Sequence, residues 1–154
     1  MRRIIASDDY EYPFSCQLIY QVLADIPGYK KWWPRGVKVK VLEDKGNNLG
    51  SKIEVWASGG WFRCKTTCLN FPNRVDIQYY AGVVLGESNW SIKPLKNGMT
   101  KVSYTIDLEP HGALPRALSN VVNISTIHSI QFKRVLKSLD QYLNAFNENL
   151  SASR

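Results

Sequence analysis

Two polar side chains interrupt the apolar face of a predicted C-terminal helix. Ser125 and His128 fall on the same side of this helix as Phe132, because residues three or four apart are neighbours on a helical surface. A hydroxyl and an imidazole at these positions could bind the polar head of a ligand, and the imidazole could transfer a proton. Acid–base catalysis would need a partner carboxylate, and no spacing fixes one. A histidine satisfied by a neighbouring serine or backbone group is the alternative.

Trp90 and Tyr104 are the second group of candidate ligand contacts. They lie on two predicted strands joined by Asn97-Gly98, the strongest hairpin signal in the chain. Alternation predicts that both rings face inward, where the phenol could anchor a ligand; ordinary core packing is the alternative. Both can face inward only with a three-residue loop or a bulge, because a strict two-residue turn would pair Trp90 with Thr105.

Two adjacent tryptophans, Trp32 and Trp33, follow a pair of lysines. Neighbours on a helix point about 100° apart, so one narrow stripe cannot bury both rings equally. We expect Trp33 to face the ligand site. We expect Trp32 to lie at the rim with Lys30, Lys31 and Arg35, a composition typical of a bilayer interface. The alternative is that both rings are shared between core and rim.

The sequence does not offer suitably placed residues for a disulfide, a metal site or a pair of catalytic carboxylates. Cys64 and Cys68 lie four apart on a predicted strand, on one face and too far apart for a disulfide. A metal site would need two further ligands that the sequence does not offer nearby, so we expect reduced thiols, no metal and no cofactor. The acidic stretch 7–11 is expected to form a solvated strand face rather than a pair of catalytic carboxylates. No residue is assigned a catalytic role.

The composition limits the class of protein and of partner. A chain of 154 residues is long enough for one domain with a real core. Its net charge of +7, without a nucleic-acid-binding motif, permits contact with membrane headgroups or nucleic acid without selecting either. The tryptophan pair and the outer side of the last helix favour a peripheral contact with anionic membrane, and we do not expect nucleic acid as a partner. No apolar run could span a bilayer, and acids follow the start before any signal sequence forms. We expect a cytoplasmic protein and leave its oligomeric state open.

These candidate residues are positioned by a distinctive order of elements. The patterns predict a strand at 2–13, a helix at 16–24 capped by Ser15, a short helical turn within 25–34, six antiparallel strands within 37–109 and a long amphipathic helix at 114–146. Within the predicted strand 61–69, Phe62, Cys64, Thr66 and Cys68 make the better buried face. We expect a single domain over 1–146 and a frayed tail over 147–154.

Three segments carry a resemblance to a known superfamily. They are Val22-Leu-Ala-Asp-Ile-Pro-Gly-Tyr-Lys-Lys-Trp-Trp-Pro34, Trp90-Ser-Ile-Lys-Pro-Leu-Lys-Asn-Gly-Met-Thr-Lys-Val-Ser-Tyr104 and Gly112-Ala-Leu-Pro115. The chain resembles the START-like superfamily (SRPBCC), which includes Bet v 1, polyketide cyclase/dehydrase-like proteins and coenzyme Q-binding proteins. The resemblance covers almost the whole chain. It implies an α+β helix-grip fold: a curved seven-stranded antiparallel sheet wrapped around a long C-terminal helix, with two short helices after the first strand.

The same resemblance implies a cavity between sheet and helix for an apolar small molecule or lipid, without a built-in cofactor or a catalytic motif. The first hypothesis is therefore a non-catalytic carrier of a polyketide, quinone or lipid. The second is a polyketide cyclase or dehydratase in which Tyr104, His128 or Arg63 assists proton transfer. The third is a protein-interaction module that uses Ile127 and Ile130, which fall among basic residues on the outer side of the predicted helix.

Overall fold

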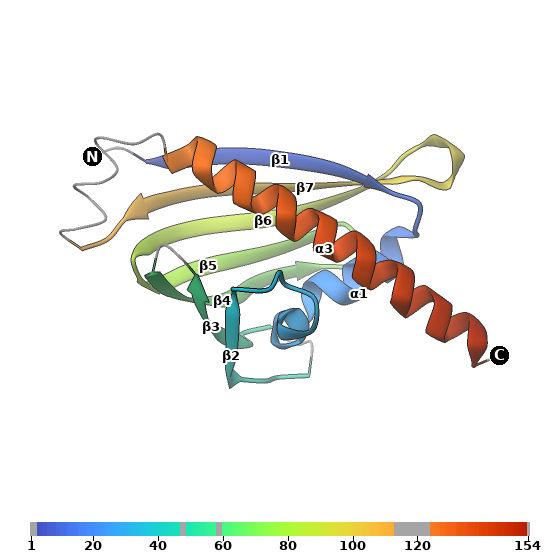
Figure 1. The fold of residues 1–154 in the computed structure, drawn as a ribbon, viewed down its shortest axis with the longest axis horizontal. Coiled ribbons are helices and arrows are strands. Elements are labelled where there is room, and N and C mark those ends of the chain that lie inside the picture. The colour runs from blue at the N-terminus through green and yellow to red at the C-terminus, as the bar shows by residue number, and fades with distance from the viewer. Residues whose placement is uncertain (1–2, 47–48, 58–59, 113–123, 154) are drawn as a thin grey trace.

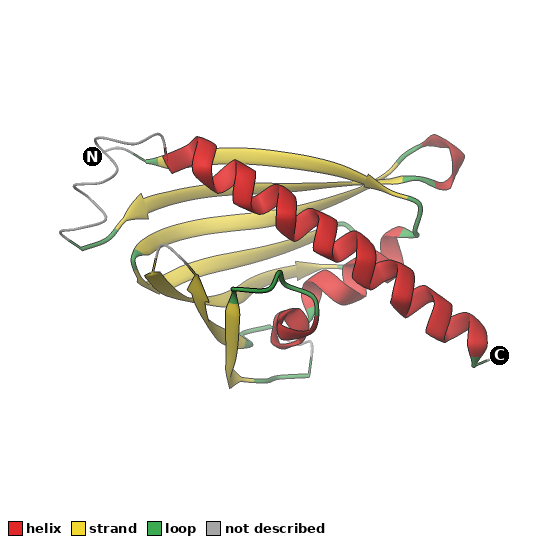
Figure 2. Ribbon diagram, in the orientation of Figure 1, coloured by secondary structure: helices red, strands yellow, loops and turns green. Residues whose placement is uncertain are grey.

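The computed structural model describes residues 3–46, 49–57, 60–112 and 124–153, with the side chains of the last helix described from Phe132 onward. In chain order the elements are β1 Ile4–Tyr12, α1 Cys16–Ala24, the 3-10 helix η1 Ile26–Lys31, β2 Lys38–Glu43, β3 Lys52–Ala57, β4 Gly60–Asn70, β5 Arg74–Gly82, β6 Val84–Pro94, the 3-10 turn η2 Lys96–Gly98, β7 Thr100–Pro110 and α3 Ile124–Ala152. Figure 2 shows their distribution.

The seven strands form one antiparallel sheet in the order β1-β7-β6-β5-β4-β3-β2. The first strand therefore pairs with the last, and the others follow as a meander. In Figure 1 the sheet curves and α3 crosses its concave side, while α1 lies beneath the C-terminal half of α3. This arrangement confirms the predicted α+β architecture of a curved sheet closed by one long helix. The hydrophobic core lies between the concave face of the sheet and the helices.

The hairpin between β6 and β7 has the register that the alternation requires. Trp90 pairs with Tyr104, so both side chains point to the concave face. The turn residues Asn97 and Gly98 have φ of 65° and 74°, the left-handed conformation that this dipeptide favours. The backbone N–H of Leu95 donates to the carbonyl of Met99 over 2.8 Å. This hydrogen bond encloses the three residues Lys96–Gly98, so the loop is one residue longer than a strict two-residue turn, as predicted.

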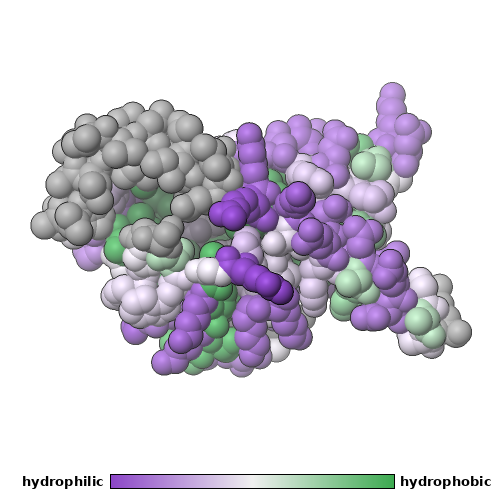
Figure 3. Space-filling view, viewed as in Figure 1, coloured by the Kyte–Doolittle hydropathy of each residue, from purple (hydrophilic) through white to green (hydrophobic). Residues whose placement is uncertain are grey.

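Helix α3 is held to the sheet by its apolar side and by one buried hydrogen bond. Leu136, Leu139 and Leu143 are buried, and the Tyr12 hydroxyl on β1 donates to the carbonyl of Leu136 over 2.8 Å. The opposite side of the C-terminal half is largely hydrophilic in Figure 3. No helix in the described ranges is long and apolar enough to cross a membrane.

The C-terminal helix is longer than predicted. It continues to Ala152, so residues 147–152, expected to be a frayed tail, are helical. The reason is local: no Gly or Pro follows Phe146 to end the helix. The predicted start of this helix, near residue 114, lies outside the described residues.

Both short helices are capped by side chains, α1 by Ser15 as the sequence predicts and η1 by Asp25, which the sequence analysis did not identify. The backbone N–H of Leu18 donates to the Ser15 hydroxyl over 3.2 Å at the start of α1. Asp25 does the same for η1, because its carboxylate accepts the backbone N–H of Gly28 over 3.2 Å. Each cap satisfies a donor that the helix leaves unpaired.

Strand β4 departs from the predicted face after its middle. Cys64 and Thr66 are buried as predicted, but Cys68 is exposed. The β4–β5 register shifts between Thr66 and Cys68, so the irregularity turns Cys68 to the other side of the sheet. On the outer face, the Arg63 guanidinium lies 5.5 Å from the centre of the Trp61 ring, as expected for side chains turned away from the core. All three cysteines are free thiols.

Candidate functional site

Three of the predicted ligand contacts meet in one aromatic cluster. Trp90, Tyr104 and Phe132 are 0%, 3% and 5% exposed. The Tyr104 ring stacks on Phe132 with 4.1 Å between centroids and an interplanar angle of 4°. The Trp90 ring lies 4.4 Å from Tyr104. These distances are those of direct contact, so a ligand would lie beside these rings and not between them.

A small polar group adjoins this cluster. The hydroxyls of Tyr79 and Tyr104 are 2.6 Å apart in a buried hydrogen bond. Ser88 on β6 is 3% exposed, and its Oγ has no hydrogen-bond partner in the part of the chain that the structure describes. The indole Nε1 of Trp90 likewise makes no well-aligned hydrogen bond within the described residues, although it is near enough to the Tyr29 hydroxyl to offset part of the rise that burial causes in the pKa of Tyr29. We call Tyr79, Ser88, Trp90 and Tyr104 the polar cluster. Sequence reasoning missed Tyr79 and gave Ser88 no role, although alternation places both on inward faces.

The two phenols of the polar cluster are held in the neutral form. Burial is the largest cause and raises the pKa of both Tyr79 and Tyr104 above the ordinary tyrosine value. The Ser88 hydroxyl is near enough to offset part of this rise, although it makes no well-aligned hydrogen bond to either phenol. A neutral phenol can donate a hydrogen bond to a ligand oxygen but is a poor base.

Asp8, like Cys68, lies on the opposite face of the sheet from the one predicted. It belongs to the acidic stretch 7–11, expected to be solvated, yet it is only 8% exposed. In β1 it lies opposite Tyr104 and shares the inward side with the buried residues Ile4 and Tyr12. The period-two spacing from Ile4 carried this signal, but the surrounding acids hid it. A carboxylate therefore lies on the same face of the sheet as the polar cluster.

The tryptophan expected at the rim is the more buried of the two. Trp32, expected at the membrane rim, is 5% exposed, whereas Trp33, expected to face the ligand site, is half-buried. Trp32 follows the last residue of η1 and has left helical geometry at φ −131°, which turns its ring inward to 4.9 Å from Tyr29. Trp33 stacks on the same tyrosine at 5.5 Å, and the two tryptophan rings are themselves 6.2 Å apart. The predicted membrane contact thus loses its aromatic anchor.

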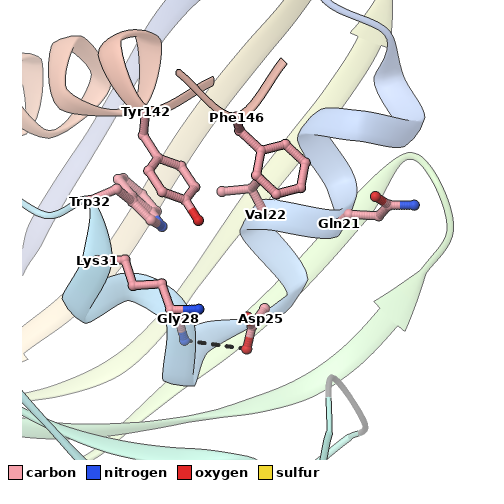
Figure 4. Close-up of a pocket in the computed structure, with 8 residues that line it drawn as sticks. All are labelled: Gln21, Val22, Asp25, Gly28, Lys31, Trp32, Tyr142 and Phe146. Carbon is pink, nitrogen blue, oxygen red and sulfur yellow. Dashed lines mark hydrogen bonds between the residues drawn. The ribbon is translucent and has the colours of Figure 1, made fainter. Parts of the chain in front are cut away.

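A pocket of about 220 Å³ lies between α1, η1 and the C-terminal half of α3. Figure 4 shows Tyr142 and Phe146 of α3 on one side and Asp25 and Lys31 on the other, with the Trp32 ring forming a wall. The Nε1 of Trp32 has no hydrogen-bond partner among the described residues. No single sequence motif marks this pocket, since its walls come from three separate elements.

The remaining predicted residues fall into two groups. Lys30, Lys31 and Arg35 are exposed. The side chains of Ser125 and His128, and those of Ile127 and Ile130, lie outside the described residues. Among the described residues, no group of three or more His, Cys, Asp or Glu side chains is arranged to hold a metal ion.

Solved structures share this architecture over nearly their whole length. A START superfamily protein from Mycobacterium smegmatis is 18% identical with a TM-score of 0.72, and the match covers 92% of this chain and 98% of that one. The Zhui aromatase/cyclase from Streptomyces sp. R1128 is 14% identical with a TM-score of 0.75, over 93% and 94% of the two chains. A protein from Thermus thermophilus is 17% identical with a TM-score of 0.75, over 92% and 97%. At such identities these likenesses establish the fold, which is the START-like helix grip.

Comparison with curated proteins gave no match. A family model does match the sequence. The model for polyketide cyclase/dehydrase and lipid transport proteins aligns with residues 12–131, which run from the last residue of β1 to the first part of α3 and include the whole polar cluster. The chain therefore belongs to the polyketide cyclase/dehydrase and lipid transport family.

Proposed function

We propose that this protein binds a hydrophobic small molecule of the polyketide, quinone or lipid class between the sheet and α3, without catalysing a reaction. The observation that carries the proposal is the pair of unpartnered buried polar atoms, Ser88 Oγ and Trp90 Nε1. They adjoin the Tyr79–Tyr104 hydroxyl pair on the concave face of the sheet. Such atoms are uncommon in folded proteins and call for an explanation.

The energetics favour a ligand with an oxygen acceptor. Leaving a buried donor unpaired costs about 1–3 kcal/mol. An indole N–H can only donate, so an oxygen placed near Trp90 would recover that free energy. A quinone, a polyketide ketone and a lipid ester each combine such an oxygen with an apolar body that aromatic walls can bury. Ser125 and His128 are proposed as further polar contacts from α3.

A peripheral contact with anionic membrane remains part of the proposal. It rests on Lys30, Lys31 and Arg35, which are exposed, because Trp32 is buried. Exposed cations near an anionic surface contribute about 1 kcal/mol each. A carrier that exchanges its ligand with a cytoplasmic membrane face needs no more than such a weak and reversible contact.

A cyclase or dehydratase is the second candidate, favoured by the chemistry of the phenols. Tyr79 and Tyr104 stay neutral through burial and could donate hydrogen bonds to a ketone as it becomes an enolate. Asp8 supplies a carboxylate on the same face. This reading requires turnover of a polyketide-like substrate, whereas the carrier reading requires binding alone.

A binding titration tests the proposal. Delipidated protein is titrated with decylubiquinone, which quenches tryptophan fluorescence, and in competition with oleate. Saturable binding that Tyr104→Phe weakens about tenfold would support the proposal. A lost hydrogen bond to the ligand costs about 1.4 kcal/mol, and that free energy corresponds to a tenfold change in affinity. Tyr80→Phe is the matched control, because Tyr80 follows Tyr79 and its ring contacts Lys65 instead of the core. Binding that Tyr104→Phe and Tyr80→Phe leave equally unchanged would place the ligand elsewhere.

A further inference from the structure

The pocket between α1, η1 and α3 differs from the polar cluster in its walls, its openness to solvent and its charge. Its apolar side consists of Val22 from α1 and Tyr142 and Phe146 from α3. The two α3 rings stack with 6.0 Å between centroids and are half-buried. These residues offer a planar apolar surface that remains reachable from water. A flat ring would bury its faces there.

The polar side of the pocket contains one donor that the protein leaves unused. Trp32 is 5% exposed and its Nε1 has no hydrogen-bond partner within the described residues. In Figure 4 the indole ring reaches the pocket beside Tyr142. Because the indole N–H is only a donor, the group that satisfies it must carry an acceptor atom.

Two opposite charges line the pocket around this donor. Lys31 is exposed and forms none of the ion pairs found among the described residues. Asp25 is engaged as the cap of η1, where its negatively charged carboxylate accepts the backbone N–H of Gly28 over 3.2 Å. Gln21 and Tyr142 add an amide and a hydroxyl to the lining. Of these polar groups, the Lys31 ammonium and the Trp32 N–H favour a carboxylate, and the ammonium offsets the charge of Asp25.

The size of the pocket limits the ligand to about one ring. A closed cavity of about 150 Å³ holds a benzene molecule, and this pocket measures about 220 Å³. The additional volume accommodates a short side chain. A drug-sized molecule or a long lipid chain needs about 300 Å³ or more.

We propose that this pocket is a separate binding site for a small monocarboxylate with one aromatic ring. The ring packs against Val22, Tyr142 and Phe146. The carboxylate accepts the Trp32 Nε1–H and lies near the Lys31 ammonium. The proposal does not depend on occupancy of the polar cluster, because a different tryptophan and residues of α1, η1 and the C-terminal half of α3 form the site.

The test observes the indole N–H resonances of the full chain, labelled with ¹⁵N at tryptophan and titrated with 3-phenylpropanoate. The resonance of Trp32 is assigned by its loss in Trp32→Phe. The expected result is a saturable shift of the Trp32 resonance, with that of Trp90 unmoved. The alcohol 3-phenylpropan-1-ol, of the same shape without the charge, should bind about tenfold more weakly.

Two exposed lysines provide matched variants that preserve the fold. Lys31→Gln should weaken 3-phenylpropanoate about threefold to fivefold, the size expected for a solvated charge pair, and leave the alcohol unaffected. Lys30→Gln, next to it but outside the pocket lining, should change neither. The proposal is overturned if the Trp32 resonance does not shift saturably, if the alcohol binds as well as the carboxylate, or if Lys31→Gln and Lys30→Gln behave alike.

Discussion

The hydroxyl groups of Tyr79 and Tyr104 lie 2.6 Å apart on neighbouring parts of the concave face, where the two residues are 5% and 3% exposed. Each phenol is the other's partner, and Ser88 Oγ beside them has none in the described chain. The hydrogen bond between these hydroxyls stabilises the core. It also orients the two phenols in advance, as the proposed binding of a ligand oxygen requires.

The effects of removing the two hydroxyls on stability should not be additive. Tyr104→Phe leaves the Tyr79 hydroxyl buried without a partner, so the free energy of unfolding should fall by about 1–3 kcal/mol. The double variant Tyr79→Phe/Tyr104→Phe should cost less than the sum of the two single variants. Urea denaturation of the four proteins measures this coupling. Strict additivity would mean that the hydroxyls do not interact.

Alkaline pH should reveal the buried phenols. Four of the eight tyrosines are buried, and burial raises the pKa of Tyr12, Tyr29, Tyr79 and Tyr104. A phenol whose pKa is higher in the folded state stabilises that state fully below the ordinary value of about 10, and this stabilisation is lost as the pH rises through the raised value. Tyrosinate absorbance should therefore show about half of the phenols ionising only as the circular dichroism of the fold disappears. Ionisation of all eight near pH 10 with the fold intact would contradict the burial.

The thiols should differ in reactivity. Cys68 is exposed, whereas Cys16 and Cys64 are buried, and burial raises the pKa of the Cys64 thiol. Because the thiolate is the reactive form, a disulfide reagent should modify one thiol per native chain rapidly and the other two only after denaturation. Cys68→Ser should remove the rapid phase. A rapid phase that survives in Cys68→Ser would mean that Cys16 or Cys64 is accessible, and a wild-type protein without any rapid phase would mean that β4 has the regular alternation first predicted.

The hairpin between β5 and β6 should be intolerant of a side chain at Gly82. This residue has φ +110°, and a Cβ there would approach Phe62 Cα to 2.5 Å and collide with the Trp61 carbonyl. Gly82→Ala should reduce the free energy of unfolding by about 3 kcal/mol or more, from strain and overlap together. Gly36→Ala isolates the strain, since Gly36 has φ +92° with no atom within 4 Å of the added Cβ, and should cost about 1–2 kcal/mol. Equal costs in thermal or urea unfolding would exclude the overlap.

The sequence predicts the fold well because its signals are periodic and local. Period-two alternation placed Trp90 and Tyr104 on the inward face and required a loop longer than two residues at Asn97-Gly98, as their pairing confirms, and Ser15 marked the start of α1. These features depend on a few adjacent residues. Their outcome does not change with the arrangement of the rest of the chain.

The details of the site were less predictable because they depend on local geometry that has no distinct sequence signature. The register shift in β4 turned Cys68 outward. The change of backbone direction at the end of η1 buried Trp32 in place of Trp33. The surface pocket requires the distances between three helices, which no pattern within one helix contains.

The most direct test of the central claim is native mass spectrometry of the purified protein, followed by denaturing extraction and identification of the released molecule. The account predicts a quinone, polyketide or lipid bound at near unit stoichiometry, with occupancy reduced in Tyr104→Phe and preserved in Tyr80→Phe. A wild-type protein that is empty as purified, and remains empty after incubation with a total lipid extract of the producing cells, would contradict it.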